Sequence, residues 1–211
     1  METITEIEKN RSMCRISLSS GNHYWLKDTD LTDTVYFPGK DVDPEEFEHF
    51  VLLCQYPRAL NDAVRMLSRR ACSTGEIRTG LLRRRYSDQT IEMVLYKLSR
   101  EKLTDDRSFA IQWSHYRMRK SLGKSRIRQE LRQKGVPEEN IEEAVLCVDE
   151  DALFEQALRY AVKKLKNITD EKNEKDIQRA VRSLVQRGYD WETAKQACQE
   201  AVRMIQSELQ K

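Results

Sequence analysis

Arginine and lysine carry the most concentrated chemistry in this sequence. Three arginines are consecutive at Arg83–Arg85, and the stretch Arg117–Lys134 holds eight cationic residues against a single acid, Glu130. Guanidinium and ammonium groups bind phosphates and carboxylates, and arginine does so with a planar fork of donors. We therefore predict contact with nucleic acid or an acidic protein surface through a basic set of residues: Arg78, Arg83, Arg84, Arg117, Arg119, Lys120, Lys124, Arg126, Arg128, Arg132 and Lys134.

The residue patterns that catalysis or cofactor binding needs do not occur in the sequence. No glycine-rich phosphate cradle and no HExxH metal motif is present. The three histidines, His23, His49 and His115, have no partners at motif spacing and are interpreted as structural. The acidic pair Asp105-Asp106 falls where a helix should begin, so the helix dipole accounts for it without a metal. We predict a protein that is not an enzyme, with no catalytic residue, metal site or cofactor.

Aromatic residues and cysteines are expected to serve the core. Phe109, Trp113 and Tyr116 recur at helical spacing, which favours packing, with base stacking as the alternative. The five cysteines are scattered and form no CxxC motif, which predicts buried free thiols in a reducing compartment: Cys14, Cys54, Cys72, Cys147 and Cys198. No secretory signal and no membrane-spanning run is legible, so a cytoplasmic protein is expected.

Charge is distributed unevenly along the 211 residues. Residues 1–56 carry 5 Lys or Arg against 11 Asp or Glu, residues 57–136 carry 20 against 8, and residues 137–211 carry 12 against 16. A basic middle between acidic ends predicts a directed electrostatic surface. A solvated helical surface of mixed charge is the alternative.

The first 56 residues differ from the rest. Alternation of polar and apolar residues predicts short strands at Ile4–Ile7, Cys14–Leu18 and His23–Leu26. Asp43 followed by Pro44 is typical of a helix start, and this helix is expected to run to about residue 55 and end at Tyr56-Pro57. The prediction is a β-rich extension over 1–56 with one short helix.

The remaining chain repeats itself about every 50 residues. Apolar residues recur with the spacing 4, 5, 5, 4 in three sets: Ile77, Leu81, Tyr86, Ile91, Leu95; Ile127, Leu131, Val136, Ile141, Val145; and Ala180, Leu184, Tyr189, Ala194, Cys198. Each set spans two helices and the turn between them, and a further helix precedes each pair. The fold class predicted is mainly α, with three tandem three-helix repeats over 57–104, 105–149 and 150–211 in an elongated array behind the small β element.

Helical spacing gives part of the basic set a direction. Arg128 and Arg132 lie one turn apart and share a flank of the middle helix of the second repeat. Arg78 occupies the equivalent position of the first repeat, and Val181 that of the third. Partner contact is therefore expected from the first two repeats, and the third repeat is expected to add little to DNA binding.

Three segments together resemble the RecX family of regulatory proteins. They are Arg85–Asp88 (RYSD), Leu103–Ala110 (LTDDRSFA) and Gly123–Val136 (GKSRIRQELRQKGV). The likeness is strong over about residues 59–145 and weaker over the third repeat, and the N-terminal extension resembles that of some Gram-positive members. Arg85 and Lys102 stand where glycine is usual in the family, which puts turn geometry in doubt.

The resemblance implies a non-catalytic, cytoplasmic modulator of the RecA recombinase in DNA recombination, DNA repair and the SOS response. It implies binding in the groove of the RecA filament on single-stranded DNA, with weak contact to the DNA itself, and we expect a monomer. Two alternatives are left open by the residues: a sequence-non-specific nucleic-acid-binding repeat protein, or a helical scaffold that binds only proteins.

Overall fold

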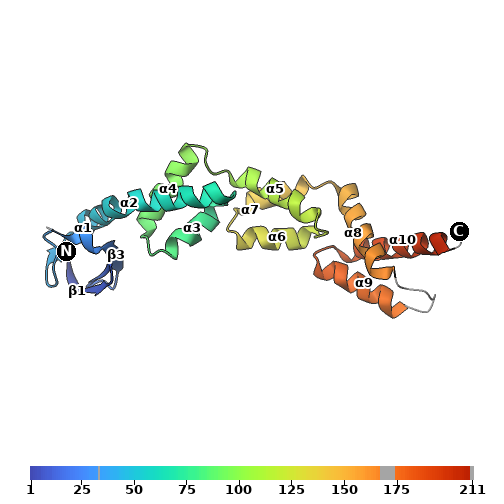
Figure 1. The fold of residues 1–211 in the computed structure, drawn as a ribbon, viewed down its shortest axis with the longest axis horizontal. Helices are drawn as coiled ribbons and strands as arrows, with labels where there is room; N and C mark the ends of the chain where they lie inside the picture. Colours follow the sequence, from blue (N-terminus) through green and yellow to red (C-terminus); the bar gives the residue numbers. More distant parts are fainter. Residues whose placement is uncertain (33, 167–173, 210–211) are drawn as a thin grey trace. The chain divides into compact units, whose positions relative to one another are not determined.

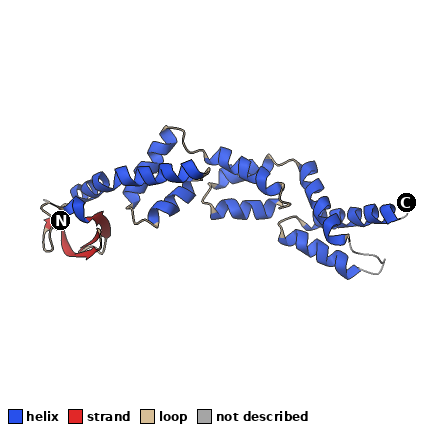
Figure 2. Ribbon diagram, viewed as in Figure 1, coloured by secondary structure: helices blue, strands red, loops and turns tan. Residues whose placement is uncertain are grey.

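The computed structural model describes residues 1–32, 34–166 and 174–209 and is mainly α-helical, as predicted (Figures 1 and 2). The chain divides into two compact units, Met1–Asp105 and Asp106–Lys211. The first unit contains the sheet and one three-helix repeat, and the second unit contains the other two repeats. The finer division at residues 56, 104 and 149 stays a prediction.

A small antiparallel sheet forms the start of the first unit. Its strands are β1 (Glu2–Asn10), β2 (Met13–Leu18), β3 (His23–Lys27) and β4 (Asp41–Val42), in the order β3-β2-β1-β4. The three predicted strands are confirmed, while the two-residue β4 was too short to carry a periodic signal. Alternation places Ile4, Ile16 and Leu26 in the core. A one-turn helix, α1 (Asp28–Leu31), follows β3.

Helix α2 (Pro44–Arg69) overturns the predicted helix end at Tyr56-Pro57. Asp43 caps the helix as expected, its side chain accepting hydrogen bonds from the backbone N–H groups of Glu45 and Glu46. The helix then continues through Pro57. Proline removes one hydrogen bond to the carbonyl four residues earlier, and this carbonyl belongs to Leu53, an exposed residue of the helix.

Tertiary packing explains why α2 stays continuous. Its N-terminal half buries Phe47 and Val51 against the sheet, and its C-terminal half buries Ala59 and Ala63 against the next two helices. One helix therefore serves two hydrophobic cores, as Figure 1 shows for α2 running from the strands to α3 and α4. This shared packing outweighs the local cost of the proline.

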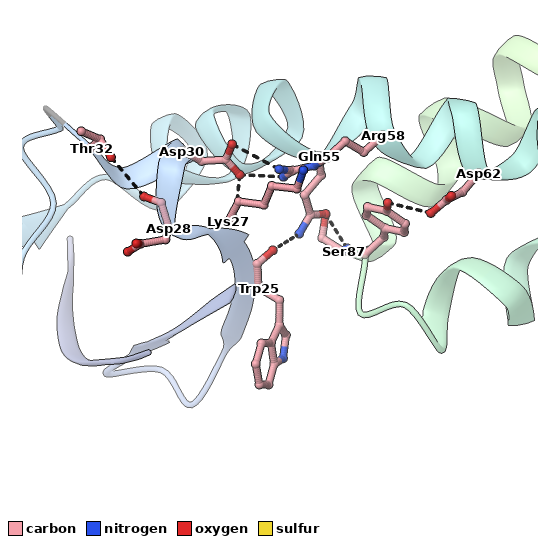
Figure 3. A network of polar contacts seen from close by, with 10 residues as sticks. Trp25, Lys27, Asp28, Asp30, Thr32, Gln55, Arg58, Asp62 and Ser87 are labelled. Carbon is pink, nitrogen blue, oxygen red and sulfur yellow. Dashed lines mark hydrogen bonds and ion pairs between the residues drawn. The ribbon is translucent and has the colours of Figure 1, made fainter. Parts of the chain in front are cut away.

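The first repeat is completed by α3 (Thr74–Leu82) and α4 (Asp88–Arg100). Ser73 forms a capping box with Glu76, and Ser87 caps α4. The fully buried Gln55 on α2 ties the repeat to the sheet (Figure 3): its Nε2 donates to the Trp25 carbonyl and its Oε1 accepts from the Ser87 N–H, each at 2.8 Å.

The second unit contains two repeats around one hydrophobic core. The second repeat consists of α5 (Asp106–Met118), α6 (Lys124–Gln133) and α7 (Glu138–Leu146). The third consists of α8 (Glu150–Leu165), α9 (Glu174–Gln186) and α10 (Trp191–Leu209). The apolar positions of the 4, 5, 5, 4 pattern are buried in all three repeats, except that Tyr86 is half-buried. Pro137 is the N-cap residue of α7.

The turn between the second and third helices has the same left-handed geometry in every repeat. Gly135 and Gly188 have φ angles of 68° and 92°, and Arg85 adopts φ 65° at the equivalent position without glycine. Lys102 has φ 54°, so the second departure from the family pattern also keeps the left-handed conformation. Both residues therefore adopt a backbone conformation that is strained for a residue with a Cβ and unstrained for glycine.

Candidate nucleic-acid interface

The predicted contact arginines of the middle helices form ion pairs with glutamates of the protein itself. Arg128 on α6 donates from Nε and Nη2 to the Glu142 carboxylate on α7, at 2.7 and 2.9 Å. Arg78 on α3 pairs with Glu92 on α4 at 2.5 Å, which repeats the same contact 50 residues earlier. The guanidinium of Arg128 lowers the pKa of Glu142, and that of Arg78 lowers the pKa of Glu92. These arginines join neighbouring helices rather than projecting freely.

Glu130, the single acid of the basic stretch, collects a second group of cations. Its carboxylate accepts from Arg117 Nε at 2.6 Å and from the Trp113 indole N–H at 3.2 Å, and lies 3.7 Å from Arg126. The Glu130 side chain is only 12% exposed, so its charge requires this compensation. Arg117 and Arg126 thus neutralise an internal carboxylate.

Further members of the basic set also have partners within the protein. Arg132 donates to Glu138 at 2.9 Å, Arg84 lies 3.4 Å from Asp62, and Lys124 pairs with Glu150. The ammonium group of Lys134 lies 4.0 Å from the centre of the Trp113 ring. These four residues therefore also interact with other side chains of the protein.

Arg119 and Lys120 do meet other cations, in a pocket of about 730 Å³ within the second unit. We call this the basic pocket. It lies where α5 ends, beside the C-terminal half of α8 and the turn after α9. Its charged lining residues are Arg119, Lys120, Arg159, Lys163, Lys164 and Arg187.

Arg187 connects the segments that line the basic pocket. Its Nε donates to the Ser121 carbonyl at 2.7 Å and its Nη2 to the Lys120 carbonyl at 2.6 Å. The same guanidinium stacks 4.5 Å from the centre of the Tyr160 ring, whose hydroxyl lies 2.7 Å from Ser183 Oγ. One side chain therefore fixes the turn after α5, helix α8 and the turn after α9 relative to each other.

Carboxylates of the described residues compensate little of the charge of the basic pocket. Among the residues that the structure describes, the carboxylate paired with its lining cations is Glu155, 3.4 Å from Arg159. The C-terminal ends of α5 and α9 bring partial negative charge that stabilises Arg119, Lys120 and Arg187. Such half-charges offset part of the excess, and the pocket stays suited to an anionic ligand.

Sequence reasoning missed the four cations that the third repeat supplies, Arg159, Lys163, Lys164 and Arg187. The acidic average of residues 137–211 concealed them. Two signals were available: Arg159 and Lys163 lie one helical turn apart, and Arg187 occupies the repeat position of Arg84 and Lys134. All three residues at that position fold back on the first helix of their own repeat.

The aromatic residues and cysteines follow the predictions in part. Phe109 is buried and stacks on the half-buried Trp113 with ring centres 6.1 Å apart, whereas Tyr116 is 46% exposed. All five cysteines are free thiols, but the expectation of burial holds for three: Cys54 is half-buried, and Cys147, the C-cap residue of α7, is exposed. Burial raises the pKa of the Cys198 thiol to about 11.

In the described ranges 1–32, 34–166 and 174–209, His, Cys, Asp and Glu side chains form no group of three or more that is able to hold a metal ion. No helix within these ranges has the length and hydropathy needed to cross a bilayer.

Comparisons with known proteins match each repeat separately. The family models described as the first, second and third three-helix domains of RecX match residues 59–98, 105–145 and 150–198. The chain is 40% identical over 144 residues to the regulatory protein RecX of Prosthecochloris aestuarii, across 68% of this chain and 93% of that protein. It is 30% identical over 199 residues to that of Clostridium tetani, across 91% of each.

Solved structures agree on the fold. A crystal structure of regulatory protein RecX aligns with a TM-score of 0.61 at 21% identity, across 98% of this chain and all of that one. The crystal structure of RecX from Lactobacillus salivarius aligns with a TM-score of 0.64 at 19% identity, across 70% of this chain and 96% of that one. The repeated three-helix architecture is thus shared with these proteins.

Proposed function

Because the chain belongs to the RecX family of regulatory proteins, we propose that it binds the RecA recombinase filament on single-stranded DNA. In this role it modulates the recombination and ATPase activities of the recombinase during DNA repair and the SOS response. It acts in the cytoplasm, as a monomer and without catalysis of its own. Its partners are the filament and, more weakly, the single strand itself.

The basic pocket is the observation that carries this proposal. Six cations surround a space of about 730 Å³, and arginine and lysine side chains are the usual contacts to phosphate oxygens. A filament groove offers both phosphates and acidic protein side chains, and either would supply the charge that the pocket attracts. The ion pairs made by Arg78, Arg128 and Arg132 leave the basic pocket as the better candidate for contact.

Neutralising two cations of the basic pocket tests the proposal. The double variant Lys163→Gln and Lys164→Gln should weaken binding to the filament and to single strands. For single-strand binding by this variant, the slope of log binding constant against log salt concentration should be smaller in magnitude by about 1.4, because each lost phosphate contact removes about 0.7. The matched control is Lys195→Gln with Arg203→Gln, two exposed cations of α10 that do not line the pocket.

Filament growth and ATP turnover by the recombinase should be followed in the same titrations. Full-length protein should change both, and the pocket variant should need a higher concentration for the same effect than the control variant does. Equal affinity for bare strand and filament would favour a plain nucleic-acid-binding protein instead. Binding to the recombinase alone with no effect of DNA would favour a protein scaffold.

A further inference from the structure

A second cationic pocket lies within the first unit, between the sheet and the first repeat. It has a volume of about 430 Å³ and is lined by Trp25 and Lys27 of β3, by Arg58 of α2, and by the turn residues Arg83–Arg85. We call it the Trp25 pocket. It shares no residue with the basic pocket, which lies in the second unit.

Buried hydrogen bonds hold the walls of the Trp25 pocket in place. Gln55 bridges the Trp25 carbonyl and the Ser87 N–H, so strand β3 and the turn before α4 are fixed to the same point of α2 (Figure 3). The Tyr86 hydroxyl donates to Asp62 at 3.0 Å on the same helix. The indole of Trp25 extends from β3 away from Gln55 (Figure 3), which leaves its ring at the pocket.

The cations of the Trp25 pocket exceed its acids. Arg58 is held by the Asp30 carboxylate with contacts of 2.6 and 3.2 Å, and Arg84 lies 3.4 Å from Asp62. In the described part of the chain, no carboxylate forms an ion pair with Arg83 or Arg85, and both are exposed. The positive charge of these two guanidinium groups is therefore not neutralised by a carboxylate among the described residues, which favours an anionic ligand.

The indole adds a requirement that charge alone does not explain. The guanidinium of Arg85 lies 3.8 Å from the centre of the half-buried Trp25 ring, so this face of the indole takes a planar group, and in this structure that group is Arg85 itself. An acidic peptide would use the arginines and leave the indole unused. A single-stranded nucleotide uses both, because it has an accessible planar base beside a phosphate, whereas a duplex keeps its bases stacked.

We propose that the Trp25 pocket binds one nucleotide of single-stranded DNA: the base replaces the Arg85 guanidinium on the Trp25 indole, and Arg83 and Arg85 hold the phosphate. The N-terminal sheet then supplies the aromatic half of the site and the first repeat supplies the cationic half. This inference rests on the single-strand partner of the proposed function and deepens it, since it adds a site for the strand in a different unit of the protein from the basic pocket.

Tryptophan fluorescence provides a direct test, because the chain has three tryptophans. In full-length protein carrying Trp113→Phe and Trp191→Phe, Trp25 is the sole indole. Oligothymidylate should quench its emission, and an abasic strand of equal length should bind more weakly and leave the emission nearly unchanged. Equal quenching by both strands, or binding of oligothymidylate with no change in Trp25 emission, would overturn the proposal.

Two variants separate stacking from charge. Trp25→Ala should weaken oligothymidylate binding roughly tenfold and abasic-strand binding little, as expected for loss of one stacked base. Arg83→Gln with Arg85→Gln should weaken both strands. Arg100→Gln is the matched control. Arg100 also lies over an aromatic ring, that of Tyr96, but it is the last residue of α4 and does not line the Trp25 pocket.

The competing occupant, an acidic protein segment, has its own signature in this assay. An acidic peptide that quenches Trp25, while oligothymidylate does not, would refute the nucleotide site. No recombinase is present, so failure here leaves the filament proposal untouched. Conversely, loss of filament binding in the basic-pocket variant would not change the Trp25 response.

Discussion

At the residue scale, two glycines bring the second and third repeats together within the second unit. The Gly123 N–H donates to the Arg187 carbonyl at 2.9 Å, and the Ser125 N–H donates to the Gly188 carbonyl at 3.1 Å. A Cβ on Gly123 would lie 2.2 Å from the backbone of Gly188, and one on Gly188 would lie 2.3 Å from the Arg126 nitrogen. The two turns approach so closely that a side chain on either glycine would separate them.

We expect Gly123→Ala to destabilise the protein by about 3 kcal/mol, because the obstructing atoms are backbone and cannot move aside cheaply. Gly39→Ala is the control: Gly39 has φ 90° with nothing within 4 Å of its Cβ position, so it should cost only about 1 kcal/mol of backbone strain. Urea unfolding followed by circular dichroism measures both. Equal losses would mean that the close approach does not contribute to stability.

At the element scale, ion pairs between consecutive helices recur with the repeat. Arg78–Glu92 joins α3 to α4, and Arg128–Glu142 joins α6 to α7. In the third repeat the equivalent of Arg128 is Val181, which is buried in the core. Hydrophobic packing thus replaces the ion pair at this position of the third repeat, in line with the small net value of exposed ion pairs.

The Arg128–Glu142 pair predicts a pH-dependent contribution to stability. Because Arg128 lowers the pKa of Glu142 in the folded protein, the contribution is complete above the usual glutamate pKa of 4.5 and is lost as the pH falls through the lowered value. The difference in unfolding midpoint between wild type and Arg128→Gln should therefore be constant from pH 7 to 6 and narrow below about pH 4.5.

Salt offers a second measurement on the same pair. The difference between wild type and Arg128→Gln should also shrink at high ionic strength, because the side chains of Arg128 and Glu142 are 29% and 44% exposed. A difference that ignores both pH and salt would mean that Arg128 acts through packing of its methylene groups.

Helix α2 is the element that joins sheet and repeat, and Gln55 is its polar link. Gln55→Met keeps the volume but leaves the Ser87 N–H and the Trp25 carbonyl without this partner, and should cost about 2 kcal/mol. Faster hydrogen exchange of the Ser87 amide should accompany the loss. Gln89→Met, at an exposed position of α4, should change neither measurement. A cost below about 0.5 kcal/mol would refute the role of this link.

At the scale of the whole molecule, the two units have separate cores. Two clusters of buried residues belong to the first unit, and one cluster with members from Phe109 to Ala201 belongs to the second. The third repeat contributes Leu153, Leu184 and Ala197 to the core that it shares with the second. A cut near Asp149 would therefore expose apolar surface of the second repeat, whereas a cut between the units would not divide any of these clusters.

We expect fragments 1–105 and 106–211 each to fold alone, with cooperative unfolding and native-like helical content. A fragment ending at residue 149 should be less stable than the full chain in its second repeat, because the shared core is cut. Circular dichroism and urea unfolding of the three fragments check this. A disordered 106–211 fragment beside a stable 1–149 fragment would contradict it.

Local pattern in the sequence determined much of the fold. The 4, 5, 5, 4 spacing, the caps at Asp43, Ser73 and Ser87, and the left-handed glycines at 135 and 188 depend on neighbours in the chain. Such features are legible because helical periodicity and capping are set within a few residues. The basic set could also be listed from the sequence, because counting charges segment by segment shows where cations are concentrated.

Tertiary structure decided which cations pair and which gather. Arg128 meets Glu142 only because a turn folds α7 beside α6, and Lys120 meets Arg187 across 67 residues because the second and third repeats share a core. Charge averaged along the chain does not reveal either of these contacts. The continuity of α2 through Pro57 has the same origin: burial on two cores outweighs a local preference, and burial is a property of the packed molecule rather than of the segment.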